Sequence, residues 1–411
     1  MRTSSIRRSR ARATASAALG MLLVGIASVP AHAAGVRDQQ WHLDTMGAEK
    51  IWQLSTGKGV TVAVIDSGVD RNNPDLRGQV LGGKDFATEE SGDQFTDYLG
   101  HGTGMAGLIA GTGARDGGNG AFGLAPGAKI LPVRVPGLEE GTASIAESDK
   151  EFNRVVPPAI KYSADAGAKV INVSLGATTG SQELTDAVKY ALDKGALVFA
   201  SVGNTGDKSN KAEYPGATPG AVGVGAVDKK LTRIPESQYG PQVDIVAPGK
   251  DTVAACGDGI CKGTGTSDAT ALASAAAALI WSKHPDWTNN QVLKVMLNTI
   301  AAPTEGAKRS DYIGYGAIRP LRALNSPGDP GPADVRPIDD LSETVTPSAS
   351  ASASADPAPA ESSAAPAPAP AATQAASEDG GNTGLWIGLG IGAAVLLGAG
   401  VAVSVLRSRR S

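Results

Sequence analysis

Short runs of apolar residues alternate along the chain with segments whose apolar residues recur at helical spacing. Gln182–Lys194, which ends at Gly195, has the pattern of an amphipathic helix between two such runs. Continuous apolar runs rich in valine and isoleucine are typical of strands buried on both faces. The alternation therefore predicts an α/β fold, a parallel β-sheet with helices on both faces. The predicted strands are Val60–Ile65, Lys129–Val135, Lys169–Val173, Ala196–Ser201 and Ala221–Val227.

The first 33 residues have the layout of a secretory signal peptide. Five arginines and no acidic residue occupy positions 1–12, an apolar run follows from Ala17 to Val29, and Ala31-His32-Ala33 offers a small-residue cleavage site. The alternative is a membrane-spanning or amphipathic N-terminus, but the apolar run is shorter than the roughly 20 residues of a span. We expect export, with cleavage after Ala33 and an N-terminal arm over residues 34–50.

A second apolar segment lies near the C-terminus. Residues 385–406 contain no charged side chain and are followed by a basic tail at 407–411. A helix of this length rises about 33 Å, enough to cross a bilayer, and the arginines of the tail predict a cytoplasmic C-terminus. A cell-wall sorting signal has a similar layout, but its Leu-Pro-x-Thr-Gly motif is missing. We therefore expect one retained transmembrane helix.

Residues 326–384 are predicted to link this helix to a globular domain at 51–325. Within 347–377, 27 of 31 residues are alanine, proline or serine. Such a stretch cannot bury a core and should stay extended and disordered. The chain is therefore expected to hold an extracytoplasmic domain on a stalk above the membrane.

Composition narrows the classes of function. The net charge of −4 lacks the basic excess of proteins that bind nucleic acid. Two cysteines are too few for a zinc ribbon or a disulfide-built miniprotein. A G-x-G-x-x-G match at residues 102–107 does not follow a strand, as a dinucleotide-binding loop would. The remaining candidates for chemistry are polar residues at the ends of the predicted strands.

An acid, an imidazole and a hydroxyl each stand beside glycines where a predicted element begins or ends. Asp66 follows the first strand, His101 opens a small apolar helix, and Ser267 opens an alanine-rich helix that runs to about Ser282. Alone, Asp66 is explained as a turn or cap residue and Ser267 as a helix N-cap. Together they predict nucleophilic catalysis, because a serine needs a base to take its proton and a carboxylate holds the imidazole's tautomer.

The blocks around these residues resemble the subtilisin-like serine proteases, the subtilases of peptidase family S8. They span residues 64–70, 100–103 and 265–269 and stand in the subtilase order Asp, His, Ser. The resemblance implies a subtilisin-like fold and a serine endopeptidase that forms an acyl-enzyme intermediate. It also implies that Asp66 orients His101, that His101 is base and then acid, and that Ser267 is the nucleophile.

Further similarity extends over about residues 40–305. Asn204 resembles the side-chain donor of the oxyanion hole; its structural alternative is a turn residue beside Gly203. Ser174, Leu175 and Gly176 resemble the segment that pairs with substrate backbone, although they also read as the end of a core strand. Asp268, directly after the nucleophile, is a departure that should disfavour acidic substrates or raise the His101 pKa; Ala271 replaces the usual proline.

The arrangement of the whole chain resembles the mycosins, membrane-anchored subtilases associated with type VII secretion. Only about 30 residues separate the predicted cleavage site from the Asp66 block, too few for an inhibitory prodomain. The resemblance implies processing of exported protein or peptide substrates and membrane proteins of a secretion complex as partners. The alternatives are a scaffold with little or no turnover, and an esterase or acyl transferase that uses the same residues.

Cys256 and Cys261 flank a four-residue segment shortly before Ser267. In an exported protein a local disulfide is expected here rather than two free thiols. No cofactor is predicted. Asp75 matches a position that supplies a calcium ligand in some subtilases, but the loop around residues 113–120 offers no countable set of oxygen ligands, so calcium stays unassigned.

Overall fold

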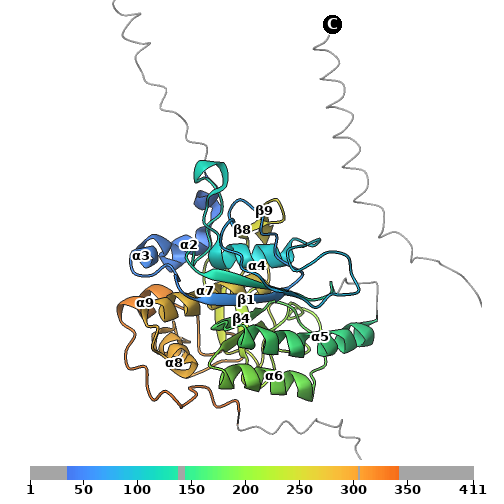
Figure 1. Cartoon of the computed structure of the whole chain (residues 1–411). Coiled ribbons are helices and arrows are strands. Elements are labelled where there is room, and N and C mark those ends of the chain that lie inside the picture. Colours follow the sequence, from blue (N-terminus) through green and yellow to red (C-terminus); the bar gives the residue numbers. More distant parts are fainter. Residues whose placement is uncertain (1–34, 138–143, 304–305, 342–411) are drawn as a thin grey trace, which may run out of the picture. The chain divides into compact units, whose positions relative to one another are not determined.

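A computed structural model describes residues 35–137, 144–303 and 306–341 (Figure 1). The predicted signal peptide at 1–33, the basic tail and the segment 385–406 lie outside the described residues. The centre of the fold is a seven-stranded sheet of order β2-β3-β1-β4-β5-β6-β7, in which every pairing is parallel. Its strands are β1 (Thr61–Asp66), β2 (Lys84–Asp85), β3 (Lys129–Arg134), β4 (Val170–Val173), β5 (Leu197–Ser201), β6 (Val222–Val227) and β7 (Ile245–Pro248).

Alternate side chains of each central strand face two different hydrophobic clusters. In β1, Val62 and Val64 belong to the first cluster, whereas Ala63 and Ile65 belong to the second. Helices cover both clusters, so each strand is buried on both faces and reads as a continuous apolar run. The predicted α/β fold is thereby confirmed. The helices are α4 (His101–Ala110) and α7 (Thr266–Lys283) over the first cluster and α5 (Ile145–Asp165) and α6 (Gln182–Asp193) over the second.

The five predicted strands correspond to β1 and β3 to β6, with ends that differ by one residue. Four strands are additional to the prediction. β2 is two and β7 four residues long, and β8 (Thr252–Cys256) with β9 (Gly259–Gly263) forms a separate antiparallel hairpin before α7. The sequences of β2 and β7 are too short to show a recognisable periodicity.

The described part of the predicted N-terminal arm packs into the body. It forms η1 (Val36–Gln39), α2 (Trp41–Met46) and α3 (Ala48–Trp52). Leu43 and Ile51 are fully buried in the first cluster. The side-chain amide of Gln40 donates to the backbone oxygens of Phe122 and Val253, at 2.7 and 2.9 Å. The boundary expected at residue 50 thus falls inside α3, because the arm supplies core residues.

The packed chain also continues past residue 325, where a linker was expected to begin. After α8 (Asn289–Thr299) and α9 (Pro320–Asn325), residues 326–341 remain in contact with the body. Ile338 is buried at 6 % exposure, and Arg336 donates to Gly220 O at 2.9 Å while pairing with Asp340. The domain boundary therefore lies nearer the start of the Ala/Pro/Ser-rich stretch.

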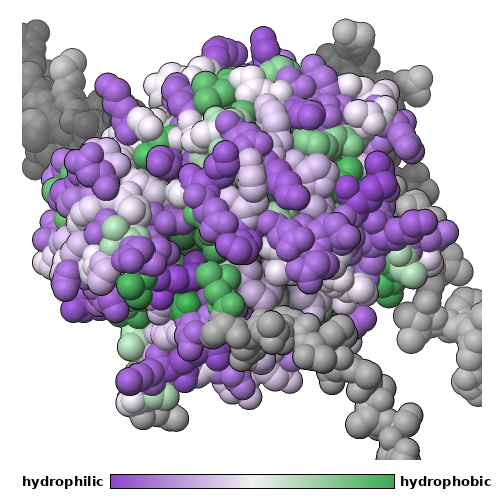
Figure 2. Space-filling model, turned by 60° about the horizontal axis from the view of Figure 1, so that its bottom comes forward, coloured by the Kyte–Doolittle hydropathy of each residue, from purple (hydrophilic) through white to green (hydrophobic). Residues whose placement is uncertain are grey.

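The described surface is mainly polar. In Figure 2, hydrophobic residues form small clusters separated by polar side chains on the face turned forward. Within the ranges that the structure describes, no helix has both the length and the apolar character to cross a membrane.

Candidate active site

Asp66 and His101 meet at the carboxyl end of the sheet. Asp66 is the last residue of β1 and is fully buried, and His101 is the first residue of α4. Asp66 Oδ1 lies 2.7 Å from His101 Nδ1. A carboxylate at this nitrogen favours the tautomer with the proton on Nδ1, which leaves Nε2 able to accept a proton.

Asp97 secures the turn in front of α4, a role that the sequence analysis missed. Its Oδ1 accepts hydrogen bonds from the Ser67 hydroxyl and the Gly100 N–H, both at 2.8 Å. Its Oδ2 accepts from the N–H and the hydroxyl of Thr103, at 2.8 and 2.6 Å. An acid shortly before a glycine-flanked helix start is the signal that would have indicated it, since first-turn N–H groups need acceptors.

Ser267 lies in the first turn of α7 and contacts the segment after β4. Its hydroxyl donates to Ser174 O at 3.0 Å, and the Ser174 hydroxyl donates back to Ser267 O at 3.2 Å. No hydrogen bond joins Ser267 to His101 among the residues described. The predicted site residues are thus arranged as two hydrogen-bonded pairs, Asp66 with His101 and Ser267 with Ser174.

Asn204 contacts the first residue of α7. Its Oδ1 accepts from the Thr266 N–H at 2.9 Å and from the Thr266 hydroxyl at 3.2 Å. These contacts orient the amide, so that the Nδ2 donors face away from Thr266. Because Asn204 is exposed, these donors are accessible beside the first turn of α7, whose N–H groups lack intrahelical acceptors.

The segment Ser174-Leu175-Gly176 continues from the end of β4. Ser174 is buried, whereas Leu175 and Gly176 are half-buried. Ser174 thus directly follows a core strand and contacts Ser267, and the two residues after it are partly accessible.

The electrostatics of the site favour a protonated His101 at neutral pH. The ionised Asp66 raises the pKa of His101 to about 9, and the charges of Asp268 and Asp97 act in the same direction. Burial raises the pKa of Asp268 to about 6, against the hydrogen bond that its carboxylate accepts from Thr252. Asp268 was expected either to disfavour acidic substrates or to raise the His101 pKa. The structure supports the increase in the His101 pKa.

Cys256 and Cys261 form the predicted disulfide, with their Cα atoms 5.7 Å apart. The bond closes the β8–β9 hairpin shortly before Ser267. Asn73 donates to Gly257 O at the tip of this hairpin, at 2.8 Å. The disulfide thus stiffens a segment that contacts the loop after β1.

Asp75, the position compared with a calcium ligand, is occupied by protein donors. Its carboxylate accepts from the N–H of Arg115 at 2.8 Å, from Arg115 Nε at 3.3 Å and from the N–H of Ala121 at 3.3 Å. Arg115 begins the short helix η2 (Arg115–Gly117). A guanidinium supplies the positive charge here, so these residues do not fit a calcium ion, which requires several oxygen ligands.

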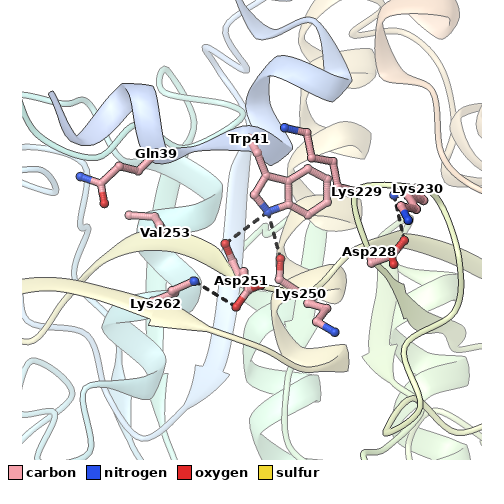
Figure 3. A pocket seen from close by; sticks show the side chains of 9 residues that line it. All are labelled: Gln39, Trp41, Asp228, Lys229, Lys230, Lys250, Asp251, Val253 and Lys262. Atoms are coloured by element: carbon pink, nitrogen blue, oxygen red, sulfur yellow. Dashed lines mark hydrogen bonds and ion pairs between the residues drawn. The ribbon is translucent and has the colours of Figure 1, made fainter. Parts of the chain in front are cut away.

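A hollow in the described surface lies beside the N-terminal arm and contains none of Asp66, His101 and Ser267. Its volume is about 470 Å³, and it lies between α2 and the β8–β9 hairpin and is lined by four lysines (Figure 3). Trp41 bridges its two sides, because the indole N–H donates to the backbone oxygens of Lys250 and Asp251 at 3.0 and 3.2 Å. None of the hydrogen bonds formed by the described part of the arm involves Asp66, His101 or Ser267.

Comparisons with known proteins identify the family. The sequence profile of the Subtilase family matches residues 57–316. The chain belongs to the subtilases. Thermitase of Thermoactinomyces vulgaris is 37 % identical to this subtilase over 211 residues, which are 51 % of the chain and 70 % of thermitase. Subtilisin Savinase of Lederbergia lenta is 37 % identical over 245 residues, 59 % of the chain and 84 % of Savinase.

Solved mycosin structures resemble this subtilase as well. The MycP3 protease from the type VII (ESX-3) secretion system aligns with a TM-score of 0.61 and 32 % identity over 70 % of the chain and 88 % of MycP3. MycP1 from Mycobacterium smegmatis aligns with a TM-score of 0.63 and 26 % identity over 75 % and 89 %. The suspected likeness to mycosins is confirmed, and the subtilase is a serine-type endopeptidase.

Proposed function

We propose that this subtilase is a membrane-anchored, extracytoplasmic processing protease of type VII secretion that cleaves exported proteins through Asp66, His101 and Ser267. The Asp66–His101 hydrogen bond of 2.7 Å carries the proposal, together with the charge coupling of His101 to Asp268, which follows Ser267 in the first turn of α7. The structural likeness to MycP1 and MycP3 supports the secretion role.

In the proposed reaction, His101 Nε2 takes the proton of the Ser267 hydroxyl as Oγ attacks the scissile carbonyl. Asn204 Nδ2 and the N–H groups of the first turn of α7 stabilise the oxyanion that forms. His101 then gives the proton to the leaving amine, the C–N bond breaks, and an acyl-enzyme remains on Ser267. Water, deprotonated by His101, hydrolyses this ester and regenerates the enzyme. Substrate backbone lies along Ser174-Leu175-Gly176.

Catalysis requires Ser267 to leave Ser174 O and turn toward His101. A rotation about one side-chain bond is enough to move a serine hydroxyl between two acceptors. A deprotonated His101 is the better acceptor, so the proposed mechanism needs pH values at which His101 has lost its proton.

The first experiment compares full-length protein with its Ser267→Ala variant. Both are incubated with a mixed peptide library, and cleavage is read by mass spectrometry; a serine-directed phosphonate reports labelling of Ser267. Cleavage and labelling by the wild type alone support the proposed triad. If neither protein cleaves any peptide although both are folded, the scaffold is favoured. If the wild type hydrolyses esters but not peptides, an esterase is favoured.

The secretion role needs a separate test in the producing cell. A strain lacking the gene is complemented with wild type or with Ser267→Ala, and both export and processing of secreted proteins are followed. We expect the variant to leave exported proteins unprocessed. Normal export and normal processing in the strain that lacks the gene would contradict a role in secretion.

A further inference from the structure

Glu213 lies against both segments that border the proposed nucleophile. A Cβ placed on Gly176 would lie 2.9 Å from Glu213 Oε2, and one placed on Gly203 would lie 2.6 Å from Oε1. Gly176 ends the segment proposed to pair with substrate, and Gly203 precedes Asn204. Only glycine at both positions leaves room for the carboxylate, which therefore reaches the space between the two segments.

The backbone around Glu213 explains this placement. β4 and β5 are neighbouring parallel strands, so the segments that follow them leave the sheet side by side. Tyr214, next to Glu213, pairs with Ala177 through two backbone hydrogen bonds of 2.9 and 2.8 Å. This pairing brings the Glu213 side chain to the ends of both strands.

A buried amide holds the carboxylate in position. Gln238 is fully buried, and its Nε2 donates to Glu213 Oε1 at 2.7 Å and to Thr205 Oγ1 at 2.8 Å. Throughout the described ranges, no hydrogen bond to Oε2 and no ion pair with Glu213 is formed. One carboxylate oxygen is thus anchored, and the other faces the substrate segment without a partner.

Among the described residues Glu213 has no ion pair, and the negative charge of Asp149 acts on it. Burial raises the pKa of Glu213 to about 7, the bond from Gln238 opposes this, and Asp149 adds to the rise. Lys211, two residues before Glu213 in the sequence, donates to Thr178 Oγ1 at 3.2 Å and forms no ion pair with Glu213. A half-buried carboxylate in such a place is stabilised by a cation that arrives with the ligand.

We propose that Glu213 determines specificity by selecting substrates with lysine or arginine at the residue whose carbonyl is attacked. With that carbonyl between Ser267 and Asn204, and substrate backbone along the segment ending at Gly176, the side chain of the same residue enters between the two segments. The long stems of lysine and arginine carry their charge away from the backbone, toward Glu213. This inference rests on the proposed function, since it requires attack by Ser267.

The test uses full-length protein and a peptide series that differs only at the attacked residue: lysine, arginine, leucine, alanine or glutamate. We expect wild-type kcat/KM for the basic peptides to exceed that for leucine by at least ~10², because an unpaired, partly desolvated carboxylate penalises neutral side chains. Glu213→Gln keeps the size and the oxygen facing Gln238 but removes the charge. It should lose most of the preference while retaining hydrolysis of the leucine peptide.

A control variant and the wild-type peptide series together test the assignment of Glu213. Glu183→Gln removes one exposed charge from α6 and should leave the preference unchanged. The wild-type peptide series needs no variant, so a folding defect in Glu213→Gln would not prevent the test. Equal cleavage of basic and neutral peptides, or an unchanged preference in Glu213→Gln, would overturn the assignment of Glu213. A wrong proposed function would give a different result from a wrong assignment of Glu213: no peptide would be cleaved, and the phosphonate would not label Ser267.

Discussion

The hydroxyl of Thr252 donates a hydrogen bond of 2.6 Å to Asp268 Oδ2, directly after the proposed nucleophile. This bond favours the ionised carboxylate and opposes the effect of burial, so Asp268 is charged above about pH 6. Asp268 then adds negative charge near His101, whose pKa is raised to about 9 chiefly by Asp66.

The pH dependence of activity should reflect the raised pKa of His101. His101 must be unprotonated to accept the serine proton, so its raised pKa shifts the pH range of activity upward. We expect kcat/KM to rise with pH to a midpoint near 9 and the midpoint to fall in Asp268→Asn, because one negative charge near the imidazolium is lost. Steady-state kinetics from pH 6 to pH 10.5 would show it, with the exposed Asp286→Asn as control. A wild-type midpoint near 7, or no difference between the two variants, would argue against this electrostatic account.

Replacing Asn204 should slow the chemical step. Asn204→Ala removes the exposed amide proposed to stabilise the oxyanion, and loss of such a donor lowers kcat by about 10²–10³. KM should change little, since the donor acts on the transition state. Asn72→Ala, at another exposed asparagine, should be neutral. Less than a fivefold loss of kcat in Asn204→Ala would remove Asn204 from the oxyanion hole.

Asp97 should matter for activity without contacting substrate. Its carboxylate accepts three hydrogen bonds from the turn that carries His101 and one from the Ser67 hydroxyl. We expect Asp97→Ala to lower kcat/KM by about 10², the effect of a small displacement of a catalytic group, and to lower the pH midpoint because Asp97 also raises the His101 pKa. Circular dichroism would confirm folding. Asp93→Ala, an exposed acid of the same loop, should retain nearly full activity, and equal losses in both variants would point to loop disorder alone.

Stability should depend on Arg115 rather than on calcium. Breaking the pair of buried Asp75 with Arg115 in Arg115→Ala should cost about 3 kcal/mol, measured by urea unfolding. Chelation by EDTA should leave the melting temperature of the wild type unchanged. A fall of several degrees on chelation, restored by calcium, would mean that an ion and not the guanidinium stabilises this part of the fold.

The sequence predicted the scaffold of the site because that information is local. Buried parallel strands are continuous apolar runs, and Asp66, His101 and Ser267 stand in glycine-rich motifs at element ends. Asp97 is indicated only by its position shortly before the helix that His101 begins. Glu213 stands in no such motif, and its role depends on partners that only the folded chain brings near, such as Gly176. Reading residues one segment at a time does not reveal such partners.

Two further features of the fold depend on tertiary packing. α5 contains Pro157 and Pro158, which remove backbone donors and would usually end a helix. Burial of Phe152, Val156 and Ile160 against the sheet outweighs that local cost. Residues 326–341 are rich in proline and acid, but Ile338 and the Arg336–Asp340 pair secure them to the body. In both cases tertiary packing overrides local composition.

The late position of α7 in the chain has a consequence for the timing of activity. α7 contacts β1, β4, β5, β6 and β7, so it forms the centre of the first cluster although it is made after all of them. A chain that emerges N-terminus first presents Asp66 and His101 long before Ser267. Because the sheet lacks its central helix until residue 283 has emerged, no partly synthesised chain holds a complete triad. Protease activity should then begin only when nearly the whole domain has been delivered.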